Sequence, residues 1–296
     1  MTSFLQFMPS QAPACEDAEA IVPVMVTSEP TPEMSETERE LVKRLRTGRA
    51  ALPVLPQVAE AALRLANDPD ARINDLAELV DTDPPIAARF MSVANSVAYW
   101  RGLLTSSTQS AIVRLGLANT RDLLFQVVYA ASAGGLKRYQ IQVQKSFKRS
   151  VVAAVAARTA ARELEIESEY DYMSGLLHDI GEARIYRILD GLPNRITDAK
   201  LVSDLVQRYH TAAGAEVAMA WKLPTEIVDA CAAHHDPQAI GAPHVRLVMI
   251  ADAVVDALEA GRSANLERFE SLLVDVGAAR RIIDLTKGAA TTSMRP

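Results

Sequence analysis

The sequence lacks the features of a secreted or membrane-bound protein. Among its 296 residues there are only two cysteines, Cys15 and Cys231, which are too few for a disulfide framework. No uninterrupted apolar run approaches the roughly 20 residues that a membrane-spanning helix needs, and the N-terminus lacks the basic start and apolar run of a secretion signal. The formal net charge of -6 at pH 7 argues against broad electrostatic binding to nucleic acid or anionic lipid. We therefore expect a soluble cytoplasmic protein that binds neither nucleic acid nor membranes.

Motifs of several common enzyme classes are also absent from the sequence. It contains no glycine-rich phosphate loop, no Ser–His–Asp spacing and no Cys-x-x-Cys pair. Aromatic residues make up only 5% of the chain, so the core has to consist mainly of Ala, Leu, Val and Ile, which suits helices. Nothing alternates with period two for long enough to demand a sheet, and we predict an all-α, multi-helix bundle.

Local signals place the helix boundaries. Ser35-Glu36-Thr37-Glu38 has the pattern of a capping box, and Asp83 precedes Pro84-Pro85, which the first turn of a helix tolerates. Gly116 and Gly134-Gly135 are expected to end helices. We expect helices at 35–48, 57–66, 73–80, 86–95, 111–116, 123–131, 142–164, 170–189, 198–208, 212–221, 223–233, 245–259 and 266–285.

All five histidines lie in the second half of the chain: His178, His210, His234, His235 and His244. His178-Asp179 lies inside an apolar helical pattern, and leaving its charge unpaired there would be costly, so we expect a cationic partner, either a metal ion or a side chain. Asp252 has a similarly apolar helical setting. Imidazoles and carboxylates together ligate divalent metals. The candidate cluster for one or two metal ions is His178, Asp179, His210, His234, His235 and Asp252.

These residues resemble the HD-domain superfamily. The resemblance rests on Gly175–Gly181, His234-His235 and Asp252, and further motifs narrow it to the HDOD family, a divergent and mostly regulatory branch. It extends from about Leu41 to Asp256. The narrowing motifs are Leu52-Pro53, Leu55-Pro56, Asp81-Thr82-Asp83-Pro84, Asn95-Ser96 and Ala111-Ile112-Val113-Arg114-Leu115-Gly116.

The resemblance implies two packed helical parts. Residues 35–135 would form an N-terminal helical subdomain, packed on an HD-like helical bundle formed by residues 136–260. Residues 1–34 contain five prolines and no helical period, so we expect a flexible leader there. Residues 261–296 are expected to form a C-terminal helical extension with a frayed tail.

The match to active HD phosphohydrolases is incomplete at Arg149. This residue stands where those enzymes supply a first histidine ligand, whereas His178, Asp179 and Asp252 match the remaining core ligands. His210 and His234-His235 resemble the additional ligands of the HD-GYP branch, although the second half of the Gly-Tyr-Pro signature is not seen. A guanidinium cannot ligate a metal and stays charged. We therefore expect Arg149 to pair with Asp179 or Asp252 in a degenerate, metal-free site without catalytic residues.

The resemblance then implies a non-catalytic bacterial signalling protein without a cofactor. It would bind a signalling protein partner or a nucleotide second messenger, whose phosphate could meet Lys148 and Arg149; its oligomeric state stays open. The alternative is a phosphohydrolase or phosphodiesterase that uses Mn, Fe or Mg on the six candidate ligands. Simpler interpretations also stand. His178-Asp179 could be a structural hydrogen-bonded pair, and His234-His235 could interact with the negative end of a helix dipole.

Overall fold

The computed structural model describes Thr31 and residues 33–47, 72–132, 135–193, 196–261 and 266–293, and the regular structure in these ranges is entirely helical. The predicted all-α class is thus confirmed. The predicted helix at 57–66, the motifs between Leu52 and Pro56 and nearly all of the leader lie outside the described residues. In chain order the elements are α1 (Glu36–Thr47), α3 (Ile73–Asp81), α4 (Pro84–Ala94), the 3-10 turn η1 (Val97–Tyr99), α5 (Thr108–Ser132), α6 (Gln140–Glu163), α7 (Asp171–Leu177), α8 (Ile180–Asp190), α9 (Ala199–Ala220), α10 (Thr225–Ala233), η2 (Pro237–Gly241), α11 (Pro243–Ala260), α12 (Glu267–Ser271) and α13 (Val276–Ser293).

Several helix ends are fixed by the local signals seen in the sequence. The Ser35 hydroxyl accepts a hydrogen bond from the Glu38 amide at 3.1 Å, as half of a capping box does. The Asp83 carboxylate accepts one from the Ile86 amide at 3.2 Å at the start of α4. Gly116, with φ 77°, breaks α5 into two helical parts, as predicted.

Four boundary predictions were wrong. The helix expected at 170–189 is interrupted at His178-Asp179, which separates α7 from α8. The two helices expected at 198–208 and 212–221 form the single helix α9. Pro243 occupies the first turn of α11, so this helix begins two residues before the predicted start and includes His244. The 266–285 segment is divided into α12 and α13, and α13 continues to Ser293 instead of fraying from Lys287.

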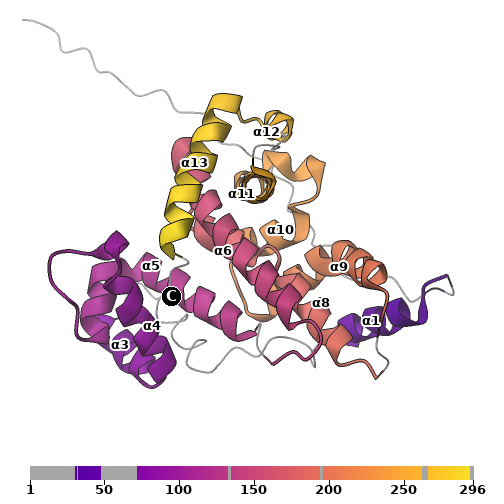
Figure 1. Cartoon of the computed structure of the whole chain (residues 1–296), viewed down its shortest axis with the longest axis horizontal. Helices are drawn as coiled ribbons and strands as arrows, with labels where there is room; N and C mark the ends of the chain where they lie inside the picture. The colour runs from indigo at the N-terminus through magenta and orange to yellow at the C-terminus, as the bar shows by residue number, and fades with distance from the viewer. Residues whose placement is uncertain are drawn as a thin grey trace, which may run out of the picture.

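The helices are arranged around α6, which crosses the middle of the molecule (Figure 1). Helices α3, α4 and α5 lie at one end, where Leu76, Phe90 and Leu124 belong to a core that also includes Met173 of α7. Helix α1 lies at the opposite end, where Leu41 packs in a separate cluster with side chains of α8 and α9. A third cluster joins α6, α11 and α13. The boundaries of the subdomains expected at 35–135, 136–260 and 261–296 stay a prediction.

Two glycines of the His-Asp motif allow close helix packing. A Cβ atom on Gly175 would lie 2.7 Å from the Ala153 carbonyl oxygen of α6, and one on Gly181 would lie 1.9 Å from the His210 carbonyl oxygen of α9. Any larger residue would therefore push α7 from α6, or α8 from α9. The glycines thus bring the His178-Asp179 break close to both neighbouring helices. Within the described ranges, no helix combines the length and the apolar character needed to span a membrane.

Candidate functional site

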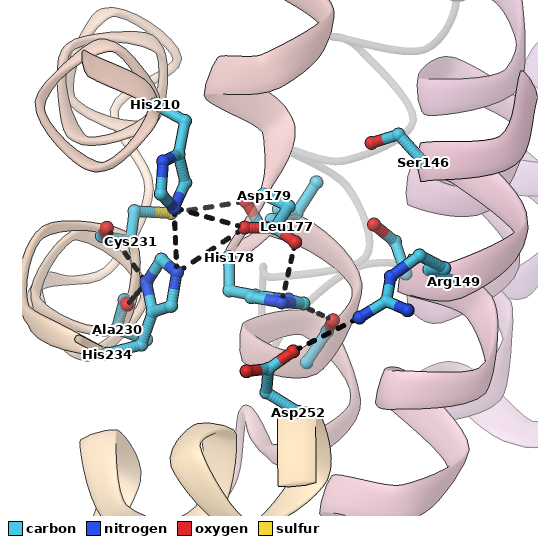
Figure 2. Close-up of polar contacts among 12 residues, drawn as sticks. Ser146, Arg149, Leu177, His178, Asp179, His210, Ala230, Cys231, His234 and Asp252 are labelled. Atoms are coloured by element: carbon cyan, nitrogen blue, oxygen red, sulfur yellow. Dashed lines mark hydrogen bonds and ion pairs between the residues drawn. The ribbon is translucent and has the colours of Figure 1, made fainter. Parts of the chain in front are cut away.

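The candidate site is built from four helices and one helix break. His178 and Asp179 occupy the turn between α7 and α8, His210 lies in the middle of α9, and His234 follows the last residue of α10. Figure 2 shows the three imidazoles gathered around Asp179, with Arg149 of α6 and Asp252 of α11 on the other side of His178. We call His178, Asp179, His210 and His234 the His-Asp centre.

Asp179 is the point on which the imidazoles converge. Its Oδ2 atom lies 3.1 Å from His178 Nε2, and its Oδ1 atom lies 3.4 Å from His234 Nε2 and 3.5 Å from His210 Nε2. The three histidines are almost completely buried, with 2–3% of each residue exposed. The helix break permits this arrangement, because neighbouring side chains on a continuous helix would point about 100° apart.

The backbone fixes how each imidazole is oriented. His178 Nδ1 lies 2.8 Å from the Gly175 carbonyl oxygen, His210 Nδ1 lies 3.0 Å from that of Gln207, and His234 Nδ1 lies 2.9 Å from that of Ala230. In each ring, Nδ1 therefore carries the hydrogen and donates it, which leaves Nε2 as the atom that faces the centre. The Nε2 atoms of His210 and His234 are only 3.3 Å apart, so two facing lone pairs there require a proton or a cation between or beside them.

The electrostatic environment gives the histidines different pKa values. Burial acts to lower the pKa of His178, but the Asp179 carboxylate outweighs it and raises this pKa to about 9. Burial lowers the pKa of His210 despite Asp179. Partial desolvation of the His235 ring, together with His234 and His210, lowers the pKa of His235 to about 4, although the residue as a whole is exposed. Burial opposes ionisation of Asp179, yet His178 and His234 hold its pKa well below its usual range.

Part of the predicted cluster could hold a metal ion. Two sets of three residues have ligand atoms within 4.8 Å of one another: His178, Asp179 and His234, and His210, His234 and His235. His235 is exposed, and its ring lies 4.2 Å from that of His234 between centroids. Nitrogen ligands oriented by backbone carbonyls are the donor set of borderline metals such as zinc or iron. This half of the site fits such an ion.

The other half of the site is occupied by arginine. Arg149 Nη2 lies 3.6 Å from Asp252 Oδ1 and 2.9 Å from Asp256 Oδ1, and Arg149 Nη1 donates to Glu259. The predicted ion pair between Arg149 and Asp252 is therefore present. Among the described residues no ion pair joins Arg149 to Asp179, the other partner that we considered. Lys148, predicted as a phosphate ligand beside Arg149, is exposed.

A second guanidinium, which the sequence analysis did not identify, contacts two carboxylates of α11. Arg268 of α12 places Nη2 2.9 Å from Asp252 Oδ2 and Nη1 2.6 Å from Asp256 Oδ2. Burial would raise the pKa of Asp252, but nearby His178 and Arg268 lower it. The acidic stripe of Asp252, Asp256 and Glu259 was visible as spacing along one helix face, whereas nothing local marks Arg268 as its partner.

Glu182 of α8 is a further residue that sequence reasoning did not identify. Its carboxyl group is partly buried near Asp179, and this burial, followed by repulsion from Asp179, raises its pKa to about 7. His244, to which we assigned no role, lies 3.5 Å (Nε2 to Oδ2) from Asp229 on α10 and contributes nothing to the His-Asp centre.

Fold and site together define an all-helical protein of the HD type, in which three imidazoles converge on Asp179 and an arginine pairs with the neighbouring Asp252. The HDOD domain family profile matches residues 52–237, more than half of the chain. The chain therefore belongs to the HDOD family.

Three comparisons illustrate its similarity to known proteins. A Shewanella amazonensis structure, assigned by name only as a metal-dependent phosphohydrolase, is 22% identical with a TM-score of 0.70, over 87% of this chain and 100% of that one. A Geobacter sulfurreducens HDOD domain protein of unknown function is 26% identical with a TM-score of 0.59, over 86% and 89% of the two chains. Ribonuclease Y of Thermus thermophilus is 32% identical over 126 residues, 43% of this chain and 19% of that enzyme. The chain spans at most 38% of the length of the first curated relatives that it matches.

Proposed function

We propose that the protein is a non-catalytic, bacterial signalling member of the HDOD family that acts in the cytoplasm by binding a protein partner. The observation that carries this proposal is the ion pair of Arg149 with Asp252. A guanidinium has no lone pair for a metal and stays cationic, so a divalent ion bound at Asp252 would have a like charge only a few ångströms away. The site is therefore degenerate as a two-metal centre.

The carboxylates of α11 are already neutralised by side chains. Arg149 contacts Asp252, Asp256 and Glu259, and Arg268 contacts the other carboxylate oxygen of the first two. Two guanidiniums thus take the place of the charge that a metal ion would supply. The acidic stripe needs no further cation to be stable where it is partly buried.

The test compares metal content and phosphodiester hydrolysis. We expect purified protein, supplied with Mn²⁺, to hydrolyse bis(p-nitrophenyl) phosphate no faster than its His178→Ala variant. Arg149→His tests the role of the arginine, because it replaces the cation by a ligand; it should raise manganese content, whereas Lys148→His on the exposed neighbour should not. Turnover by the unaltered protein that disappears in His178→Ala would contradict the proposal.

A nucleotide second messenger is a weaker candidate ligand at this site. A phosphate group would have to displace three carboxylates from Arg149, and like charges would then face each other. We expect calorimetry with cyclic nucleotides to give no heat of binding that Arg149→Ala removes. Binding that depends on Arg149 would instead support a nucleotide sensor.

Metal-dependent phosphohydrolysis is the second candidate function, favoured by the convergence of the imidazoles on Asp179. His178, His210 and His234 with Asp179, extended by His235, would hold the ion. A bound Mn, Fe or Mg ion would supply Lewis-acid chemistry at a phosphoryl oxygen. The backbone carbonyls would keep Nε2 of each ring directed at it. Stoichiometric metal that is lost in His210→Ala, together with hydrolysis, would favour this function.

A further inference from the structure

A separate surface lies at the end of the molecule formed by α3, α4 and α5 (Figure 1). It exposes large apolar side chains that soluble proteins normally cover: Val97 is 87% exposed, Leu103 76%, Leu104 73% and Val113 61%. Trp100 is also half exposed. We call these five residues the apolar patch. They come from η1, the loop that follows it and the first turns of α5.

The loop that carries the patch is held in place. Arg114 of α5 donates hydrogen bonds to the carbonyl oxygens of Ala94, at 3.2 Å, and Leu103, at 2.8 Å. The Asn95 side chain pairs with the backbone of Thr105 through two hydrogen bonds of 2.8 and 3.0 Å. Asn95 and Arg114 belong to the motifs that carry the HDOD resemblance and have no part in the His-Asp centre. A loop fixed in this way loses little conformational entropy when a partner binds.

The charged side chains in the segment that carries the apolar patch are all positive. Residues 96–117 include two arginines and neither aspartate nor glutamate. Within the described part of the chain, Arg101 has no hydrogen-bond or ion-pair partner, and Arg114 donates only to neutral oxygens. Both arginines line an open groove of about 620 Å³ together with Thr105, Gln109, Ser110 and Val113. Asp81 of α3 accepts a hydrogen bond from the Thr108 hydroxyl at 2.5 Å, and among the described residues no ion pair joins a carboxylate to either guanidinium.

We propose that this surface binds a peptide segment of a protein partner that carries both acidic and large apolar side chains. The carboxylates of the segment would pair with Arg101 and Arg114 in the groove, and its apolar side chains would cover Leu103, Leu104 and Val113. Positive charge without a counter-charge favours an acidic partner over a basic one. A small anion would leave the apolar patch exposed to water, whereas a peptide with large apolar side chains would also cover it. The inference rests on the proposed action through a protein partner and names the surface that such a partner uses.

The experiment selects binders from a displayed library of short random peptides on the purified full-length chain. We expect enrichment of peptides that combine Asp or Glu with Leu, Phe or Trp, and binding about tenfold weaker to Arg101→Glu and to Val113→Asp. Both residues are exposed and have no hydrogen-bonding role in the described fold, so the variants should keep the melting temperature of the parent. Ile141→Asp, which alters an exposed apolar residue on α6, is the matched control and should leave binding unchanged.

Three results would overturn the inference. They are a failure to enrich acidic and apolar peptides, equal binding to Arg101→Glu and the parent, and self-association of the parent that Val113→Asp abolishes, which would assign the patch to a second copy of the chain. Phosphodiester turnover that depends on His178 would contradict the non-catalytic proposal without changing any of these readouts. The two ideas can therefore fail separately.

Discussion

Gly181 of α8 lies against the backbone of His210 of α9, so closely that a Cβ atom on Gly181 would be 1.9 Å from the His210 carbonyl oxygen. Gly181 is two residues from Asp179, and His210 supplies one of the imidazoles that face Asp179. This helix crossing therefore sets the distance between the two sides of the His-Asp centre.

Gly181→Ala should destabilise the protein by about 3 kcal/mol, because the added methyl group meets backbone that cannot move without separating α8 from α9. Urea unfolding followed by circular dichroism measures the loss. Gly288→Ala is the control: nothing lies within 4 Å of the added atom in α13, and alanine favours the helix, so stability should stay or rise. Equal effects of the two substitutions would contradict the packing argument.

Stability should fall as the pH rises from about 6.5 to about 9. The His178 pKa is raised to about 9 in the folded protein, against an ordinary 6.5, so the folded state holds this proton more tightly. The contribution is complete below pH 6.5, is lost as the pH passes the folded-state value, and amounts to about 3 kcal/mol at most. Urea unfolding across this pH range should show a smaller decline in His178→Gln. An unchanged slope would show that another group carries the dependence.

Acidification should destabilise the protein through His235. Its pKa is lowered to about 4 by partial desolvation of the ring and by the neighbouring imidazoles, so the unfolded chain binds a proton first as the pH falls below 6.5. We expect the free energy of unfolding to decrease between pH 6.5 and 4, and to decrease less in His235→Gln. A variant that follows the parent curve over this range would contradict the assignment.

Arg268→Gln should raise the pKa of Asp252, because one of the two guanidiniums that favour its ionised form is removed. Titration of the aspartate side chains by NMR measures this direction. The cost in stability should stay below about 1 kcal/mol, since the Arg268 side chain is 38% exposed, and should shrink in high salt. Arg281→Gln, which breaks an exposed pair with Glu163, is the control and should leave the Asp252 titration unchanged.

Arg184 should be among the most sensitive positions outside the His-Asp centre. This completely buried residue of α8 donates to Glu216 at 2.5 Å and to the carbonyl oxygens of Ala213, at 3.2 Å, and Leu45, at 3.3 Å. Arg184→Ala should cost about 3–5 kcal/mol, because Glu216 and two carbonyls lose their partner. A double-mutant cycle with Glu216→Gln measures the coupling; strictly additive effects would contradict it.

The sequence predicted those helix ends that depend on nearby residues. Ser35, Asp83 and Gly116 act within one turn of their own position, so their effects can be recognised without the fold. The break at His178-Asp179 could not be predicted in this way, because apolar periodicity continues through it from α7 into α8. It is stabilised by contacts with other helices, above all the packing of Gly175 on α6 and of Gly181 on α9.

The residue types of the candidate site could be predicted from the sequence, but the contacts among their side chains could be predicted only in part. The histidines and Asp179 could be grouped from their chemistry, and the charge of Arg149 called for an acidic partner. That partner proved to be three carboxylates on one face of α11, two of which are shared with Arg268. Arg268 lies on a short helix far along the chain, and only the tertiary packing of α12 brings it to Asp252.

The contacts of α11 and α12 mean that the family-matched region is not a self-sufficient unit in this protein. The HDOD match ends at residue 237, before the three carboxylates that form ion pairs with Arg149. A fragment cut there would remove the ion-pair partners of this arginine and would uncover the alanine-rich side of α6 that packs against α11 and α13. Work on the His-Asp centre therefore has to retain the C-terminal helices.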